Sequence, residues 1–234
     1  MMMSNAIKSE AACARIYWAK GLLSMFLGAV LLSGCSALPD KPVRASLYDF
    51  GPGNLTTVPT ARQTALPALP ALAIDDISTS GGALDNQAVL YRLTYQNEQE
   101  LRPYTFARWS MPPAQLVRQR LREQLGQQRN IFDARGGLAL NRSQNAVLPL
   151  LLRLDLDEFS HVFTAPETSV GLIRLRATLI EQATSGEKLI AQRSVVVQRP
   201  APSADAQGGV RALTAATDAA IEEIDAWLRQ STPR

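Results

Sequence analysis

The sequence predicts a single α/β (α+β) domain, in which a mixed, largely antiparallel sheet is flanked by two main helices. Three observations support this fold class. Several segments rich in strand-forming residues alternate apolar and polar side chains, as strands with one covered face do. Two amphipathic segments, at 112–124 and 210–230, follow the period of an α-helix. The order of strands, helix, strands and helix is typical of a layered domain of this class.

Short strands are expected in the first half of the domain. Residues 46–50 alternate apolar and polar side chains and end at Gly51-Pro52-Gly53. Residues 54–69 contain two prolines and little periodicity, which predicts a loop, and Ser78 to Gly82 form a turn. The strands of this half are expected at 46–50, 72–74, 88–95 and 102–109.

The segment Ser110-Met111-Pro112-Pro113 is expected to begin the first helix. A serine hydroxyl can cap a helix, and proline is tolerated in the first turn because its missing N–H needs no partner there. The helix is predicted to run to about Gln124, with Gly126 ending it. Its arginine-rich outer face is interpreted as solvated surface.

Three longer strands and a second helix make up the rest of the prediction. Residues 150–159, 170–182 and 188–198 each keep one apolar side, which favours an antiparallel meander covered on one face. Asp155 and Asp157 could pair across strands with Arg174 or Arg176. Residues 200–209 are expected to be a linker before the helix at 210–230.

The N-terminal segment has the layout of a bacterial secretory leader. Basic residues precede a twelve-residue apolar run, and Leu31-Leu32-Ser33-Gly34-Cys35 follows it. A membrane-spanning helix needs about 20 apolar residues, more than this run offers. Small residues directly before a cysteine match the lipobox of bacterial lipoproteins. We therefore expect cleavage after residue 34 and a covalent lipid on Cys35.

A lipid on Cys35 would anchor the mature chain to a membrane without spanning it. The expected organisation is a leader at 1–34, a lipidated tether at 35–45 and one domain at 46–232. Ser36 follows the cysteine, where an aspartate usually retains lipoproteins at the inner membrane. The expected location is therefore the outer membrane, with the domain facing the periplasm.

Charge and composition argue against several functions. Of the 24 basic and 21 acidic residues, three basic and one acidic lie in the leader, so the mature chain is nearly neutral. Such a domain lacks the clustered positive charge that nucleic-acid binding needs. Cys13 leaves with the leader and Cys35 is lipidated, so no thiol remains for a disulfide or a metal.

No group of residues predicts catalysis. His161 is the only histidine and has no recognisable nucleophile partner, so a structural or a surface position is expected. Asp155 and Asp157 share a strand face and could hold a hard cation, but pairing with Arg174 or Arg176 is the favoured interpretation. We therefore predict no enzyme activity, no metal, and no cofactor beyond the lipid on Cys35.

An aromatic and arginine series stands out before the first helix. Some of these side chains are expected to pack beneath the helix, but Tyr and Trp also favour interaction surfaces. We predict a partner-binding surface from this series, which comprises Tyr91, Arg92, Tyr95, Tyr104, Arg108 and Trp109.

These segments resemble a known family. The Tyr48-Asp49-Phe50-Gly51 strand after a lipobox, then LYRLTY at 90–95 and YTFARWSMPP at 104–113, are similar to the ABC-type transport auxiliary lipoproteins, the PqiC-like group. The resemblance implies a three-layer fold with a mixed sheet and a non-enzymatic accessory role. The implied partners are ABC transporter subunits and an MCE-domain protein, in systems that move lipids or other hydrophobic molecules.

Two further possibilities remain open at this stage. The surface near Tyr104, Arg108 and Trp109 could bind another copy of the chain, giving a homo-oligomer. Alternatively, the domain could itself carry lipid, holding an acyl chain between helix and sheet, which would require an apolar cavity of several hundred Å³.

Overall fold

The computed structural model describes residues 43–53, 69–134, 148–183 and 186–231. The chain divides into two units, Met1–Val43 and Arg44–Arg234, and the second unit holds all the helices and strands described below. The predicted leader, Cys35 and most of the tether predicted at 35–45 lie outside the described residues, as does most of the loop predicted at 54–69.

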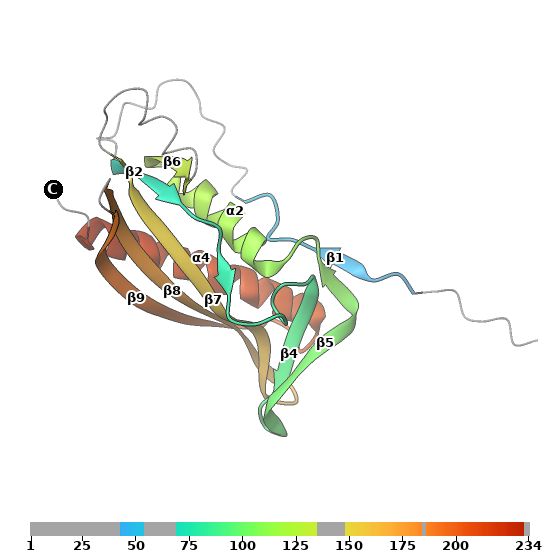
Figure 1. The fold of residues 1–234 in the computed structure, drawn as a ribbon. Coiled ribbons are helices and arrows are strands. Elements are labelled where there is room, and N and C mark those ends of the chain that lie inside the picture. The colour runs from blue at the N-terminus through green and yellow to red at the C-terminus, as the bar shows by residue number, and fades with distance from the viewer. Residues whose placement is uncertain (1–42, 54–68, 135–147, 184–185, 232–234) are drawn as a thin grey trace, which may run out of the picture. The chain divides into compact units, whose positions relative to one another are not determined.

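One long strand organises the sheet. β7 (Leu150–Ala165) pairs along one edge with β8 (Thr168–Ala183), which pairs in turn with β9 (Gly186–Pro200), and both ladders are antiparallel. This confirms the predicted meander (Figure 1). The strands are longer than predicted because paired neighbours continue the ladder through residues whose own pattern is irregular.

The other edge of β7 holds three strands in succession, all parallel to it. β2 (Leu69–Ile74), β3 (Ser78–Thr79) and β4 (Ala88–Leu93) pair with successive parts of β7. Beyond them, β6 (Arg129–Asp133) pairs with β2, β5 (Asn97–Trp109) pairs with β4, and β1 (Ser46–Tyr48) pairs with β5. The result is an open nine-stranded mixed sheet.

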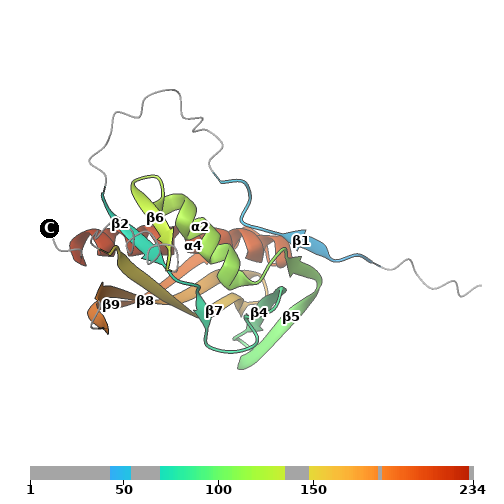
Figure 2. The same cartoon turned by 45° about the horizontal axis from the view of Figure 1, so that its top comes forward.

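Two helices cover the sheet, which confirms the predicted fold class. α2 (Pro113–Leu125) and α4 (Ala206–Ser231) both contribute their apolar stripes to one large core cluster, together with Leu152, Leu154 and Leu156 of β7. Arg120 of α2 is hydrogen-bonded to Asp218 of α4 at 2.7 Å, and Figure 2 shows the helices close together.

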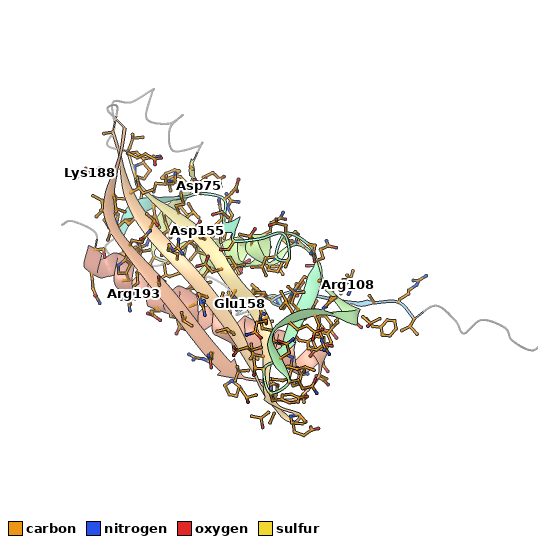
Figure 3. All side chains as sticks on the ribbon, turned by 60° about the horizontal axis from the view of Figure 1, so that its bottom comes forward. Asp75, Arg108, Asp155, Glu158, Lys188 and Arg193 are labelled. Atoms are coloured by element: carbon orange, nitrogen blue, oxygen red, sulfur yellow. The ribbon has the colours of Figure 1, made fainter. Side chains whose placement is uncertain are left out.

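The layering differs from the expected three layers. Both helices lie against the same face of the sheet, so the described residues form two layers. Figure 3 shows the other face, on which Asp155 is labelled. There Asp155 and Asp157 accept hydrogen bonds from Ser78 and Ser80, and Arg176 pairs with Asp157 at 3.5 Å. The predicted cross-strand pairing is therefore confirmed for Asp157 and Arg176.

The start of α2 corrects the predicted cap. The helix begins at Pro113, and no side chain caps it. The N–H of Ser110 instead donates to the carbonyl of Tyr48 at 2.7 Å, extending the pairing of β1 with β5. The serine is thus used by the sheet, while the proline at the first turn acts as predicted.

The start of α4 also differs, because the predicted linker at 200–209 contains its first turn. The carboxylate of Asp205 accepts hydrogen bonds from the N–H of Gly208 at 2.7 Å and from the Ser203 hydroxyl at 2.8 Å. These bonds hold the pKa of Asp205 below its usual value. Glycine is a poor helix former, and because Gly208 and Gly209 lie in this turn, the sequence pattern did not predict it as helix.

Two short strands, β3 and β6, were not predicted. The sequence predicted a turn at residues 78–79, and residues 129–133 show little alternation of apolar and polar side chains. Both are strands because a parallel neighbour supplies their hydrogen bonds. Within the described part of the chain, no helix is long and apolar enough to span a membrane.

Candidate functional site

The β4–β5 hairpin carries most of the predicted site residues and is fixed to β7 by a partly buried ion pair. Arg92 of β4 donates to both carboxylate oxygens of Glu158, at 3.1 and 3.4 Å. The same guanidinium donates to the carbonyls of Glu98 and Gln99 on β5. Ser160 donates a further hydrogen bond to Glu158 at 2.6 Å. Arg92 therefore joins both strands of the hairpin to the central strand.

The hairpin ends in a turn that exposes one aromatic residue. Thr94 donates to the carbonyl of Phe163 through its N–H at 3.0 Å and its hydroxyl at 2.7 Å. The next residue, Tyr95, is 42% exposed. We call residues 94–99 the hairpin tip. The hydrogen bonds of Thr94 fix the start of the tip to β7, so the backbone that carries Tyr95 is held in place.

An aromatic cluster fills the space beneath the hairpin. The rings of Tyr91 and Tyr104 lie 4.6 Å apart, and Phe163 of β7 meets Tyr91 edge-on at 6.2 Å. The hydroxyl of Tyr104 is hydrogen-bonded to Nδ1 of His161 at 2.9 Å. Burial, with smaller effects of Tyr91 and Asp205, raises the pKa of Tyr104. Tyr91 and Tyr104 thus brace the hairpin more than they face solvent.

His161 is fully buried, which decides between the two expected positions in favour of a structural one. Its ring packs against Gly209 in the first turn of α4, where a Cβ would lie 2.4 Å from Nδ1. Glycine is required there because any side chain would enter the imidazole. Burial lowers the pKa of His161 to about 4, against a smaller opposing effect of Asp205. The histidine therefore stays neutral at physiological pH.

We expect this burial to make stability depend on pH. In the unfolded chain the imidazole regains its ordinary pKa of 6.5, so between pH 6.5 and 4 the unfolded state binds a proton that the folded state does not. The contribution of the neutral histidine to the free energy of unfolding should be fully present above pH 6.5. It should fall by about 3 kcal/mol as the pH is lowered to 4.

The single histidine makes this prediction directly measurable. Its imidazole proton resonances should titrate near pH 4, and the H161Q variant should lose the corresponding part of the pH dependence in urea unfolding. A His161 midpoint at pH 6 or above would contradict the buried, neutral state.

Trp109 corrects the predicted surface. Its side chain has no exposed area and packs against Phe50 at 5.7 Å and Phe159 at 5.6 Å between ring centroids. The alternation along β5 points Trp109 into the core beneath the helices. Arg108 points the other way, and its guanidinium donates to the carbonyls of Tyr104 at 2.5 Å and Ala107 at 2.8 Å. The predicted series therefore does not form one surface. Trp109 lies in the core, Arg108 lies at the end of β5, and Tyr95 lies in the turn before β5.

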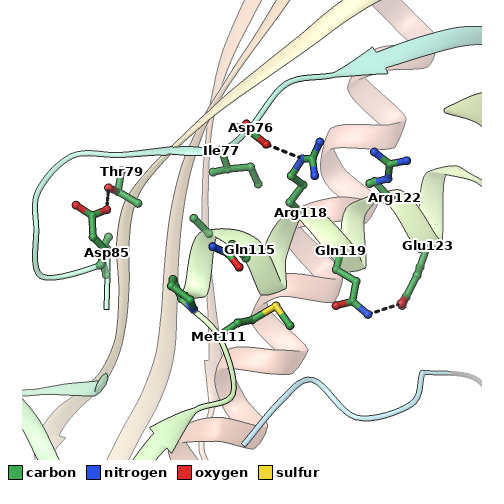
Figure 4. A pocket seen from close by; sticks show the side chains of 13 residues that line it. Asp76, Ile77, Thr79, Asp85, Met111, Gln115, Arg118, Gln119, Arg122 and Glu123 are labelled. Atoms are coloured by element: carbon green, nitrogen blue, oxygen red, sulfur yellow. Dashed lines mark hydrogen bonds and ion pairs between the residues drawn. The ribbon is translucent and has the colours of Figure 1, made fainter. Parts of the chain in front are cut away.

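A groove lies beside α2. It has a volume of about 760 Å³ and runs between α2 and the segment that connects β2 to β4 (Figure 4). Apolar side chains such as Ile77, Leu84 and Met111 line part of it. The other lining residues include five charged side chains, namely Asp76, Asp85, Arg118, Arg122 and Glu123. Arg118 pairs with Asp76 at 3.4 Å across the groove.

In the described ranges, no three His, Cys, Asp or Glu side chains are grouped as metal ligands. Sequence reasoning missed Glu158 and Gly209, which fix the hairpin and the histidine. Their partners come from distant strands, and neither residue belongs to a local motif.

The fold and the site together define a class of protein, an α+β domain with a β4–β5 hairpin that Arg92 and Thr94 fix to β7. The family of ABC-type transport auxiliary lipoprotein components matches residues 54–225, and the chain belongs to this family. It is thus an auxiliary lipoprotein component of ABC-type transport, a class of membrane-anchored envelope proteins.

Comparison with solved structures supports the fold. A Xanthomonas campestris protein of the DUF330 family is 20% identical, with a TM-score of 0.59 over 80% of this chain and 96% of that one. An uncharacterized protein is 14% identical, with a TM-score of 0.53 over 81% and 99%. No match was found among curated proteins.

Proposed function

We propose that this chain is a non-enzymatic periplasmic lipoprotein, tethered through a lipid on Cys35, that serves as an accessory subunit of an ABC transport system. The proposed partners are the transporter subunits and an MCE-domain protein, in a system that moves lipids or other hydrophobic molecules across the cell envelope. Ser36 favours the outer membrane as the site of attachment. Family membership is the observation that carries this proposal.

The hairpin tip is the docking surface that we propose. An interface gains from side chains that are already positioned before binding, because less conformational entropy is then lost. The Arg92–Glu158 pair and the hydrogen bonds of Thr94 provide this positioning. Tyrosine is frequent at the energetic centres of interfaces, which makes Tyr95 the expected anchor. Arg92, Tyr91 and Tyr104 act as positioning residues for it.

The Y95A variant should bind the partner about tenfold more weakly, since truncating an anchor residue typically costs more than 1 kcal/mol. The measurement is the Kd of the purified MCE-domain protein for the immobilised domain. The control is L189A, which removes a similarly exposed side chain from β9, and it should bind normally.

Equal Kd values for Y95A and the unchanged protein would contradict docking through the hairpin tip. Thermal unfolding of both variants should match the unchanged protein, because both side chains are exposed. Weaker self-association of Y95A, with unchanged binding to the MCE-domain protein, would instead assign the tip to contacts between copies of this chain.

The alternative role as an acyl-chain carrier fits the groove less well. An acyl chain needs a mostly apolar pocket that buries it. The groove has the required volume, but it is open to solvent along α2, so it would not bury an acyl chain, and five of its thirteen lining residues are charged. Solvent extraction of a purified C35S protein, followed by mass spectrometry, should therefore detect no stoichiometric lipid.

A further inference from the structure

Two large apolar side chains lie exposed where β1 pairs with β5. Leu47 is 71% exposed and Phe106 is 54% exposed. Leu47 lies opposite Arg108 in the parallel ladder. Side chains alternate along a strand, so Phe106 and Arg108 share one face of β5, and Leu47 lies on that same face. The residues between and after them, Ala107 and Trp109, are buried on the other face.

These residues form a patch with positive charge, which we call the β1–β5 patch and define as Leu47, Phe106 and Arg108. Residues 44–48 and 106–108 include two arginines and no carboxylate. Apolar side chains flanked by cations are the combination that binds the surface of an anionic bilayer. Leu189 and Val196 on β9 are also exposed, but the cations beside them have carboxylates across the sheet. Lys188 lies opposite Glu181, and Arg174, opposite Val196, lies opposite Glu158 on β7.

The length of chain before β1 brings this patch within reach of a membrane. Ser46 follows Cys35 by eleven residues, and a fully extended chain covers at most about 3.6 Å per residue, or about 40 Å in all. β1 is therefore the first element of the domain after the proposed lipid. Whatever path the intervening residues take, a lipid on Cys35 keeps β1 within this distance of the bilayer.

We infer that the β1–β5 patch is a second membrane contact, in which Leu47 and Phe106 enter the lipid interface and Arg108 faces anionic headgroups. This inference rests on the proposed anchor at Cys35. A lipid holds the domain near the bilayer, and the patch then fixes which side of the domain faces it. The hairpin tip lies at the other end of β5, so this contact leaves Tyr95 accessible to a partner.

The test uses fluorescent probes in the lipidated full-length protein. L47C and F106C each introduce a thiol for an environment-sensitive fluorophore, because Cys13 is removed with the leader and Cys35 is consumed by lipid. L189C is the matched control, since Leu189 is 60% exposed on β9. Each protein is placed in vesicles of phosphatidylcholine and phosphatidylglycerol that contain a phospholipid spin-labelled near the headgroup.

We expect about twofold or greater quenching of the probes at 47 and 106, because interfacial groups enter about 5–10 Å into the bilayer boundary. The probe at 189 should be little quenched. Quenching should weaken in vesicles of phosphatidylcholine alone, because the arginines then have no anionic partner.

Three results would overturn the inference. If the protein sediments with the vesicles but the probes at 47 and 189 are quenched equally, the anchor stands and the patch is not a membrane contact. The inference also fails if the emission of the probe at 47 shows burial in the absence of vesicles, and if this burial increases with protein concentration. That result would indicate that a second copy of the chain covers the patch. If the full-length protein purified from membranes does not sediment with the vesicles, both the proposed anchor and the contact are overturned.

Discussion

The W109A variant should lose about 3–5 kcal/mol of unfolding free energy, the usual cost of removing a buried aromatic side chain from a core. Trp109 has no exposed area and contacts Phe50 and Phe159 beneath the helices. The cavity left behind would open between β5 and β7. Urea unfolding of the purified variant, followed by circular dichroism, measures the loss.

The matched control is F106A, three residues earlier on the same strand. Phe106 is more than half exposed, so its removal should change stability by no more than about 0.5 kcal/mol. Similar unfolding midpoints for W109A and F106A would contradict the burial of Trp109. Loss of partner binding by W109A would therefore report damage to the fold and would not locate an interface.

The G171A variant should lose about 3 kcal/mol, or fail to fold, because β8 approaches the backbone of α4 at Gly171 too closely for any side chain. A Cβ there would lie 2.4 Å from the nitrogen of Leu213 and 2.5 Å from the carbonyl carbon of Ala212. These are backbone atoms of a helix, so they cannot move aside as a flexible side chain would. The unfolding midpoint in urea measures the effect.

G82A provides the comparison for G171A. A Cβ at Gly82 meets no atom within 4 Å, and alanine restricts the unfolded chain more than glycine does. G82A should therefore be as stable as the unchanged protein or slightly more stable. A G171A protein with an unchanged midpoint would show that α4 does not lie this close to β8.

Local patterns were sufficient to predict the elements that keep one covered face. The meander of β7, β8 and β9 followed from alternation alone, because each strand has an apolar side against the helices. β3 and β6 were missed, since their strand structure depends on parallel partners far away in sequence. Layering was also missed: amphipathicity shows that a helix covers a sheet, but not which face it covers.

The candidate site was predicted only in part, for a similar physical reason. The residue types in the series before the first helix pointed to an interaction surface, and Tyr95 is indeed exposed. Tyr and Trp are equally suited to a core, so their identity alone could not show that Trp109 is buried. The partners that position the hairpin, Glu158 and Phe163, lie on β7, more than sixty residues away.

Attachment to a membrane through Cys35 is the claim on which the proposed lipoprotein role and the second membrane contact both depend. The most direct test is the intact mass of the mature protein purified from bacterial membranes, combined with mass spectrometry of its N-terminal peptide. The predicted result is a chain that begins at Cys35 and carries a diacylglyceryl group on the thiol and an acyl group on the amine. A mature chain with a free Cys35 thiol, or one that begins at another residue, would contradict the account.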